Sequence, residues 1–285
     1  MLGEVVGLIP AIFWAISPLF YKRGLRNLNP IFGNTIRALP ATILTFTMSF
    51  LLLGVDGSLL LPPQTLFASI LSGSIGLGLG DLFYLISIKQ VGAARAVTIT
   101  SSYPLITLLL SYLLLGEEID WYIGLGTVLV VLGIAFISLD EADSKIGFRG
   151  IMVALLAAFF WSISIILAGI LPSQGHPVAV NSWRLIGLTA FSLAPFLFAY
   201  RNSGAPLLDK YSLGYLAFGG LIGLSLGWIV FIYSIELIGL SRATTLSSVS
   251  PIFTAVGEFM IERKFKGRIM LGSALTTLGV VLVTL

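Results

Sequence analysis

The sequence predicts an all-α membrane protein of ten transmembrane helices, arranged as two inverted five-helix repeats. Three observations predict this fold: an apolar composition, ten segments of membrane-spanning length, and a sequence that repeats itself. Of 285 residues, 57% are hydrophobic and only 10% are charged, whereas a soluble domain carries about 25% charged residues. So few charges cannot cover a soluble protein of this size, and the chain is therefore expected to lie in the lipid bilayer.

The ten spans follow from the thickness of the bilayer, because a hydrocarbon core about 30 Å thick needs roughly 20 apolar residues per helix. The first half supplies spans near residues 4–21, 30–53, 66–88, 95–115 and 120–139. The second half supplies spans near residues 149–171, 178–200, 212–236, 242–261 and 268–285. No Lys or Arg precedes the first span, so this span is not expected to be a cleavable signal peptide.

Basic residues lie almost entirely in one set of loops. Thirteen Lys and Arg residues flank the ends of spans 1, 3, 5, 7 and 9, and only Arg242 lies on the side of the termini. The positive-inside rule places the thirteen in the cytoplasm. We therefore expect a multi-pass protein of the plasma membrane with both termini outside the cytoplasm.

The two halves are copies of one unit. Offsetting the sequence by 147 residues gives eleven identities in 38 positions from residue 3 and fifteen in 36 from residue 72, against about one in ten by chance. Rare residues also coincide: Pro30 with Pro177, Asn34 with Asn181, Arg37 with Arg184, Arg95 with Arg242, and Pro104 with Pro251. We expect repeats at residues 1–140 and 147–285. Five is an odd number of spans, so the second copy crosses the membrane in the opposite sense, as is typical of secondary transporters.

These matched residues resemble the drug/metabolite transporter superfamily, in its ten-helix branch with two EamA domains. The resemblance covers essentially the whole chain. It rests on Trp14 and Trp161, the paired Asn and Arg residues above, the segments 95–104 and 242–251, and the Gly-Glu-Glu turn at 116–118. It implies export or exchange of small organic solutes and a central cavity walled by spans 1, 3, 4, 6, 8 and 9. It also implies that spans 5 and 10 lie at the periphery. Many relatives keep both termini in the cytoplasm, whereas the basic residues here predict the reverse.

Asp81 is the strongest candidate for a substrate-binding or coupling residue. It lies inside the third span, about 12 Å from Lys89 at 1.5 Å per residue. A carboxylate at the bilayer centre costs about 2.5–3.5 kcal/mol on insertion scales, so it usually faces a cavity. Asp81 could accept a proton or pair with a cation, or it could bond a neighbouring helix for purely structural reasons. Its repeat equivalent is Trp228.

Arg37 and Arg184 lie about 10 Å inside the second and seventh spans, with Asn34 and Asn181 one turn earlier. A pair of guanidinium groups could attract an anionic solute. Snorkelling toward the interface, or gating, is the alternative and favoured interpretation.

Small residues and prolines predict interruptions of the helices at matched positions of the repeats, which point to a binding site. These residues are Gly78, Gly80, Gly227, Pro104 and Pro251. Tight helix packing explains the glycines equally well. The hydroxyls of Ser101 and Ser248 could line a polar cavity or cap carbonyls freed by proline.

Four aromatic residues complete the candidate site, because their rings could stack on a flat solute. They are Trp14, Tyr84, Trp161 and Trp228. Most aromatic residues of membrane proteins instead serve packing or interface belts.

The sequence therefore predicts a secondary active transporter, an exporter or exchanger of a small organic metabolite that works by alternating access. Protons or a counter-solute are the expected coupling partners, no nucleic acid is expected, and a homodimer is compatible with the sequence. A channel or lipid translocator of the same fold is the alternative, and an intramembrane enzyme is a weaker one. The chain has no Cys, a single His and no P-loop, so we expect no catalytic residues, no metal, no cofactor and no ATP-driven transport.

Overall fold

The computed structural model describes residues 2–91, 96, 99–138, 148–169, 175–203, 209–250, 252–253 and 267–284, and every regular element in them is a helix. The first half contains α1 (Leu2–Gly24), α2 (Pro30–Leu59), α3 (Pro63–Ser72), η1 (Gly73–Gly80), α4 (Asp81–Val91), α6 (Tyr103–Leu110), η2 (Ser111–Leu115) and α7 (Trp121–Ser138). The second contains α8 (Phe148–Gly169), α9 (Pro177–Ser203), α10 (Lys210–Gly220), η5 (Leu221–Gly227), α11 (Trp228–Ile238), α12 (Leu240–Ser247) and α14 (Gly267–Thr284). Elements marked η are π-helices.

The helices have the length and surface of a membrane protein. Six continuous helical runs are long and apolar enough to cross a bilayer, and three shorter apolar helices lie at 103–115, 121–136 and 274–283. Large apolar side chains cover the outside, such as Leu51, Phe67 and Phe198, which are 81%, 68% and 72% exposed. Residues 251 and 254–261 of the predicted ninth span lie outside the described residues. The predicted all-α membrane fold is confirmed.

Equivalent residues begin equivalent helices. The Asn29 side chain accepts a hydrogen bond from Ile31 N at 3.0 Å at the start of α2. At the start of α9, His176 Nδ1 accepts one from Val178 N at 3.3 Å. Each capping residue is followed by a proline, whose missing N–H is no loss in the first turn of a helix.

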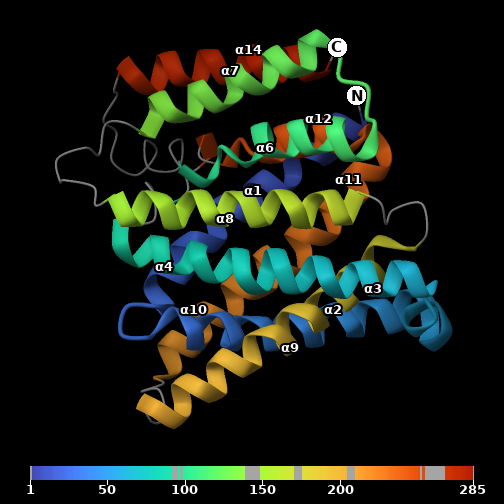
Figure 1. Ribbon diagram of the computed structural model, residues 1–285, viewed down its shortest axis with the longest axis vertical. Coiled ribbons are helices and arrows are strands. Elements are labelled where there is room, and N and C mark those ends of the chain that lie inside the picture. Colours follow the sequence, from blue (N-terminus) through green and yellow to red (C-terminus); the bar gives the residue numbers. More distant parts are fainter. Residues whose placement is uncertain are drawn as a thin grey trace.

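The two repeats meet about an axis between α2 and α9. Thr42 and Thr189, which are exactly one repeat length of 147 residues apart, contact each other through their hydroxyls at 3.1 Å. Equivalent residues touch in this way only close to a two-fold axis. The equivalent helices α7 and α14 also lie side by side, at the edge of the bundle (Figure 1). The start of α1 and the end of α14 lie at the same end of the bundle, as an even number of crossings requires (Figure 1).

The third span of each repeat packs against the other repeat. A Cβ at Gly73, the first residue of η1, would collide with the carbonyl oxygen of Arg184. A Cβ at Gly220, the last residue of α10 before η5, would collide with that of Arg37. The π-helices η1 and η5 thus lie directly on helices of the opposite repeat: η1 on α8 and α9, and η5 on α1 and α2. The helices therefore form two bundles, each of which contains helices of both repeats, rather than one bundle per repeat.

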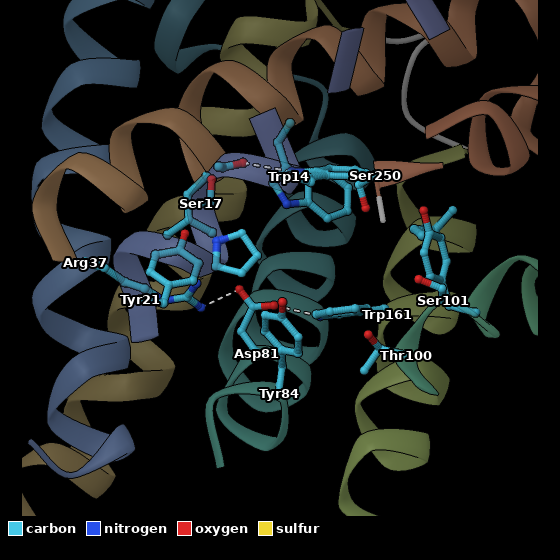
Figure 2. A pocket seen from close by; sticks show the side chains of 16 residues that line it. Trp14, Ser17, Tyr21, Arg37, Asp81, Tyr84, Thr100, Ser101, Trp161 and Ser250 are labelled. Atoms are coloured by element: carbon cyan, nitrogen blue, oxygen red, sulfur yellow. Dashed lines mark hydrogen bonds and ion pairs between the residues drawn. The ribbon is translucent and has the colours of Figure 1, made fainter. Parts of the chain in front are cut away.

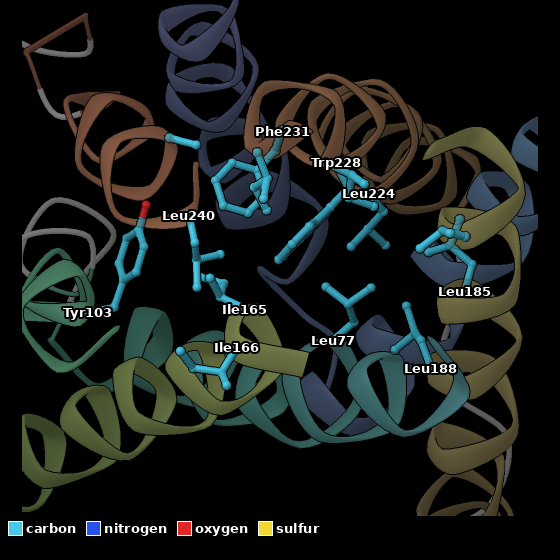
Figure 3. Close-up of a cluster of buried hydrophobic side chains, with 14 of the residues drawn as sticks. Leu77, Tyr103, Ile165, Ile166, Leu185, Leu188, Leu224, Trp228, Phe231 and Leu240 are labelled. Atoms are coloured by element: carbon cyan, nitrogen blue, oxygen red, sulfur yellow. The ribbon is translucent and has the colours of Figure 1, made fainter. Parts of the chain in front are cut away.

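A hydrophobic core joins these bundles. Leu77 of η1, Ile165 of α8, Leu185 of α9 and Phe231 of α11 are all at most 2% exposed and belong to one cluster (Figure 3). Trp228 belongs to the same cluster, and its indole also forms part of a cavity wall. The core therefore fixes one side of the candidate site.

Candidate functional site

A cavity of ≈ 100 Å³ lies between helices of both repeats (Figure 2). Six aromatic side chains line it: Trp14, Tyr21, Tyr84, Tyr103, Trp161 and Trp228. Its polar side chains are Ser17, Arg37, Asp81, Thr100, Ser101 and Ser250. Ligand sites typically have this composition, in which apolar walls carry a few converging polar groups.

Asp81 connects the two repeats at the cavity wall. It is the first residue of α4, directly after the π-helix η1, and is only 6% exposed. Its Oδ2 accepts a hydrogen bond from Arg37 Nη2 at 2.5 Å, and its Oδ1 accepts one from Trp161 Nε1 at 2.7 Å (Figure 2). The carboxylate thus has a cationic partner in its own repeat and a neutral donor in the other. This arrangement meets the requirement that a charge inside a membrane be paired.

Arg37 is held in place by its own helix and by an aromatic ring. Asn34 lies one turn earlier, and its Oδ1 accepts hydrogen bonds from Arg37 Nε at 3.1 Å and Nη2 at 2.7 Å. The guanidinium carbon lies 4.7 Å from the centre of the Tyr21 ring. Asn34 in turn donates to Gly78 O at 2.9 Å, which ties this group to η1.

The aromatic walls of the cavity form two groups of rings. Trp14 packs edge-on against Trp228 with ring centres 5.4 Å apart, and Tyr84 lies 4.9 Å from Trp161. Trp14 Nε1 donates to Gly223 O of η5 at 3.1 Å. Because edge-to-face ring pairs add stability beyond the area they bury, these walls are held in fixed orientations.

The second repeat arranges the equivalent residues differently. Arg184 Nε donates to Ser72 Oγ at 3.0 Å and Nη2 to Ser164 Oγ at 3.2 Å, and the guanidinium lies 3.7 Å from the centre of the Trp228 ring. Asn181 donates to Leu224 O at 2.9 Å. Arg184 does not line the cavity.

The structure brings together most of the residues predicted from the sequence. Arg37, Asp81, Ser101 and the four predicted aromatic residues line the cavity, and Asn34 lies behind Arg37. Ser248 is elsewhere: it is buried at the end of α12 and its Oγ donates to Thr245 O at 2.8 Å.

The predicted interruptions of the helices take the form of π-helices. Gly78 and Gly80 lie in η1 and Gly227 ends η5, so both spans widen there at matched positions while remaining helical. Pro104 lies in the first turn of α6, after a turn at residues 101–102. Pro251 lies outside the described residues.

Sequence reasoning missed Ser17, Tyr21 and Tyr103. Ser17 and Tyr21 follow Trp14 by three and seven residues, which places all three on one face of α1. This spacing could have revealed the first two. Among the described residues, no group of three or more Asp, Glu or His side chains could hold a metal ion.

Comparisons with known proteins identify the family. The model of the EamA-like transporter family matches residues 1–139 and 148–285. An uncharacterized transporter of Archaeoglobus fulgidus is 26% identical over 288 residues, covering 100% of this chain and 99% of its own. Protein LicB of Haemophilus influenzae is 24% identical over 294 residues, covering 99% and 97%. A crystal structure that is 16% identical in sequence superposes with a TM-score of 0.79 over 99% of this chain and 98% of its own. The chain is a membrane transporter and belongs to the EamA-like transporter family.

Proposed function

We propose that this protein is a secondary active transporter that moves a small organic solute by alternating access between its two inverted halves. The observation that carries the proposal is the cavity at whose wall Arg37 and Asp81 of one repeat meet Trp161 of the other. Residues of both repeats wall this cavity, so a relative movement of the halves changes its shape and its access. The two stretches matched by the family model support repeats at residues 1–140 and 147–285.

Asp81 is the proposed coupling residue. Its carboxylate already has two donors and little exposure, so a solute or proton that binds there must compete with Arg37. Breaking a buried ion pair is costly unless the freed charges find new partners. A solute that supplies those partners, or a proton that neutralises the carboxylate, therefore changes the equilibrium between two conformations of the protein. In one the cavity is open to one side of the membrane, and in the other it is open to the opposite side.

Transport into liposomes tests this proposal. The purified protein is reconstituted and screened with labelled solutes for saturable uptake that is stimulated by unlabelled solute on the opposite side. We expect such uptake for at least one solute, and we expect Asp81→Asn to lower it at least about tenfold, because a charge-assisted contact is worth up to about 3 kcal/mol. Asp56→Asn is the matched control, because Asp56 is exposed and lies far along α2 from the cavity.

Each other outcome has a definite meaning. Flux that does not saturate and shows no stimulation from the opposite side would indicate a channel. Normal transport by Asp81→Asn over a wide pH range would reject the role of Asp81. If no solute of the screen is moved, the transporter mechanism itself is rejected.

We also propose that both termini lie outside the cytoplasm. The support is the distribution of basic residues: Lys22, Arg23, Lys89, Arg149 and Arg201 all lie at helix ends on the side opposite the termini. A reporter enzyme that is active only outside the cytoplasm, fused after Leu285, is expected to be active. An inactive reporter together with an active cytoplasmic one would reverse this orientation.

A further inference from the structure

The two repeats do not balance their buried charges in the same way. Arg37 and its equivalent, Arg184, are both buried, with exposed fractions of 1% and 0%. Arg37 is paired with Asp81. The residue equivalent to Asp81 is Trp228. In the part of the chain that the structure describes, Arg184 has no carboxylate within ion-pair distance.

The contacts of Arg184 are all with neutral groups. Its Nε and Nη2 reach the hydroxyls of Ser72 and Ser164, and the Trp228 ring lies below the guanidinium. Its Nη1 is buried and makes no hydrogen bond with any described residue. Hydroxyls and an aromatic ring orient a cation but do not cancel its charge, and an uncompensated buried charge is unfavourable.

A second polar atom without a partner lies one turn away. Asn181 Oδ1 is buried and accepts no hydrogen bond from the described residues, whereas Asn34 Oδ1 accepts two from Arg37. The second repeat thus leaves one guanidinium nitrogen of Arg184 and the amide oxygen of Asn181 unsatisfied, whereas in the first repeat the equivalent amide oxygen accepts from the guanidinium of Arg37. Arg184 adjoins the cavity through the Trp228 ring, which its guanidinium contacts on one side and which lines the cavity.

The centre of the described structure therefore contains two guanidinium groups and one carboxylate, an excess of one positive charge. We propose that the transported solute is an organic anion with one net negative charge, and that Arg184 provides the positive charge that retains it. This inference rests on the proposed transport function and names the class of its substrate. The aromatic walls favour a flat, apolar body on this anion, since rings of Trp and Tyr bind such surfaces well.

A set of three one-ring probes that differ in charge tests this proposal. Benzoate, benzamide and benzylammonium carry charges of −1, 0 and +1 at neutral pH. Their binding to the purified full-length protein is measured by quenching of tryptophan fluorescence, because Trp14, Trp161 and Trp228 line the cavity. We expect benzoate to bind at least about tenfold more tightly than benzamide, as a charge-assisted contact allows, and benzylammonium to bind most weakly.

Three variants assign the preference to Arg184. Arg184→Gln removes the excess charge and should reduce the preference for benzoate over benzamide to about twofold or less, while Arg184→Lys should keep it. Arg242→Gln is the matched control, since Arg242 is partly exposed, contacts Tyr122 and does not line the cavity. If Arg184→Gln does not fold, the wild-type preference and the Arg184→Lys variant still decide the question.

Several results would overturn the inference. These are binding of none of the three probes, a preference for benzamide or benzylammonium, or a preference for benzoate that survives in Arg184→Gln. Failure here is distinguishable from failure of the proposed function. A protein that exchanges a cation or a neutral solute across liposomes remains a transporter but rejects the anion, whereas one that exchanges no solute rejects transport itself.

Discussion

The first and second repeats share the contacts that hold their helices together and differ in the charge that they present to the cavity. Asn34 donates to a carbonyl group of η1, and Asn181 donates to a carbonyl group of η5, both at 2.9 Å. Gly73 and Gly220 both give a backbone carbonyl of the opposite repeat room to approach. In contrast, Asp81 is replaced by Trp228, and Tyr21 by Ala168. The difference teaches that the two halves keep the same helix packing while the walls of the cavity between them differ in charge.

The largest effect is expected from breaking the ion pair found only in the first repeat. Asp81→Asn leaves Arg37 without a counter-charge and should lower the free energy of unfolding by about 3–5 kcal/mol, the usual cost of breaking a buried pair. Thermal unfolding in detergent measures this. The double variant Arg37→Gln/Asp81→Asn should be more stable than Asp81→Asn alone, because no unpaired charge remains at that site. Additive losses in the double variant would contradict a direct pairing.

The next effect tests the symmetric part of the comparison. Gly73→Ala and Gly220→Ala each place a Cβ against a backbone carbonyl of the other repeat, so the helices must separate. We expect both to lower the free energy of unfolding by about 2–3 kcal/mol, in the range of overpacked cores. Gly124→Ala and Gly214→Ala are the controls, because nothing lies within 4 Å of a Cβ at either position; these should be neutral or slightly stabilising. Unequal losses at Gly73 and Gly220 would show that the packing of each third span on the opposite repeat is not equivalent in the two halves.

A smaller effect should separate the two asparagines. Asn34→Ala removes the acceptor of two Arg37 hydrogen bonds as well as the bond to Gly78 O. Asn181→Ala removes a donor whose own oxygen has no partner among the described residues. Denaturant unfolding should therefore show Asn34→Ala to be less stable than Asn181→Ala by about 1–2 kcal/mol. Equal losses would mean that the Asn34–Arg37 contact contributes nothing to stability.

Composition and repeat matching were sufficient to predict the membrane fold, because lipid leaves few alternatives to helices of fixed length. They also indicated Asp81, Arg37 and Trp161, since polar residues inside spans are costly and therefore informative. The sequence could not show that Arg37 contacts Asp81 while Arg184 contacts Trp228, because those contacts depend on side-chain conformations. Nor could it show that each third span packs on the opposite repeat, since glycine spacing alone does not reveal which helix lies against it.

The smallest effect concerns the start of the third span of each repeat, where equivalent residues again differ. Asp209 caps α10 by accepting hydrogen bonds from Tyr211 N and Ser212 N, both at 2.8 Å, whereas its equivalent, Pro62, provides no side-chain cap to α3. The bonds from Ser212 lower the pKa of Asp209 below its ordinary value. Because its folded-state pKa is lowered, the carboxylate contributes stability above its ordinary pKa of about 3.9 and loses it as the pH falls further.

Asp209→Ala should therefore lower the unfolding temperature slightly at pH 7, and the difference from the wild type should shrink as the pH falls below the lowered pKa and the wild-type carboxylate becomes protonated. Gln64→Ala, in the exposed first turn of α3, is the control and should show no such pH dependence. Thermal unfolding at a series of pH values measures both variants. A constant difference at all pH values would mean that Asp209 acts through backbone conformation rather than through its charge, and that the two repeats begin their third spans by the same means.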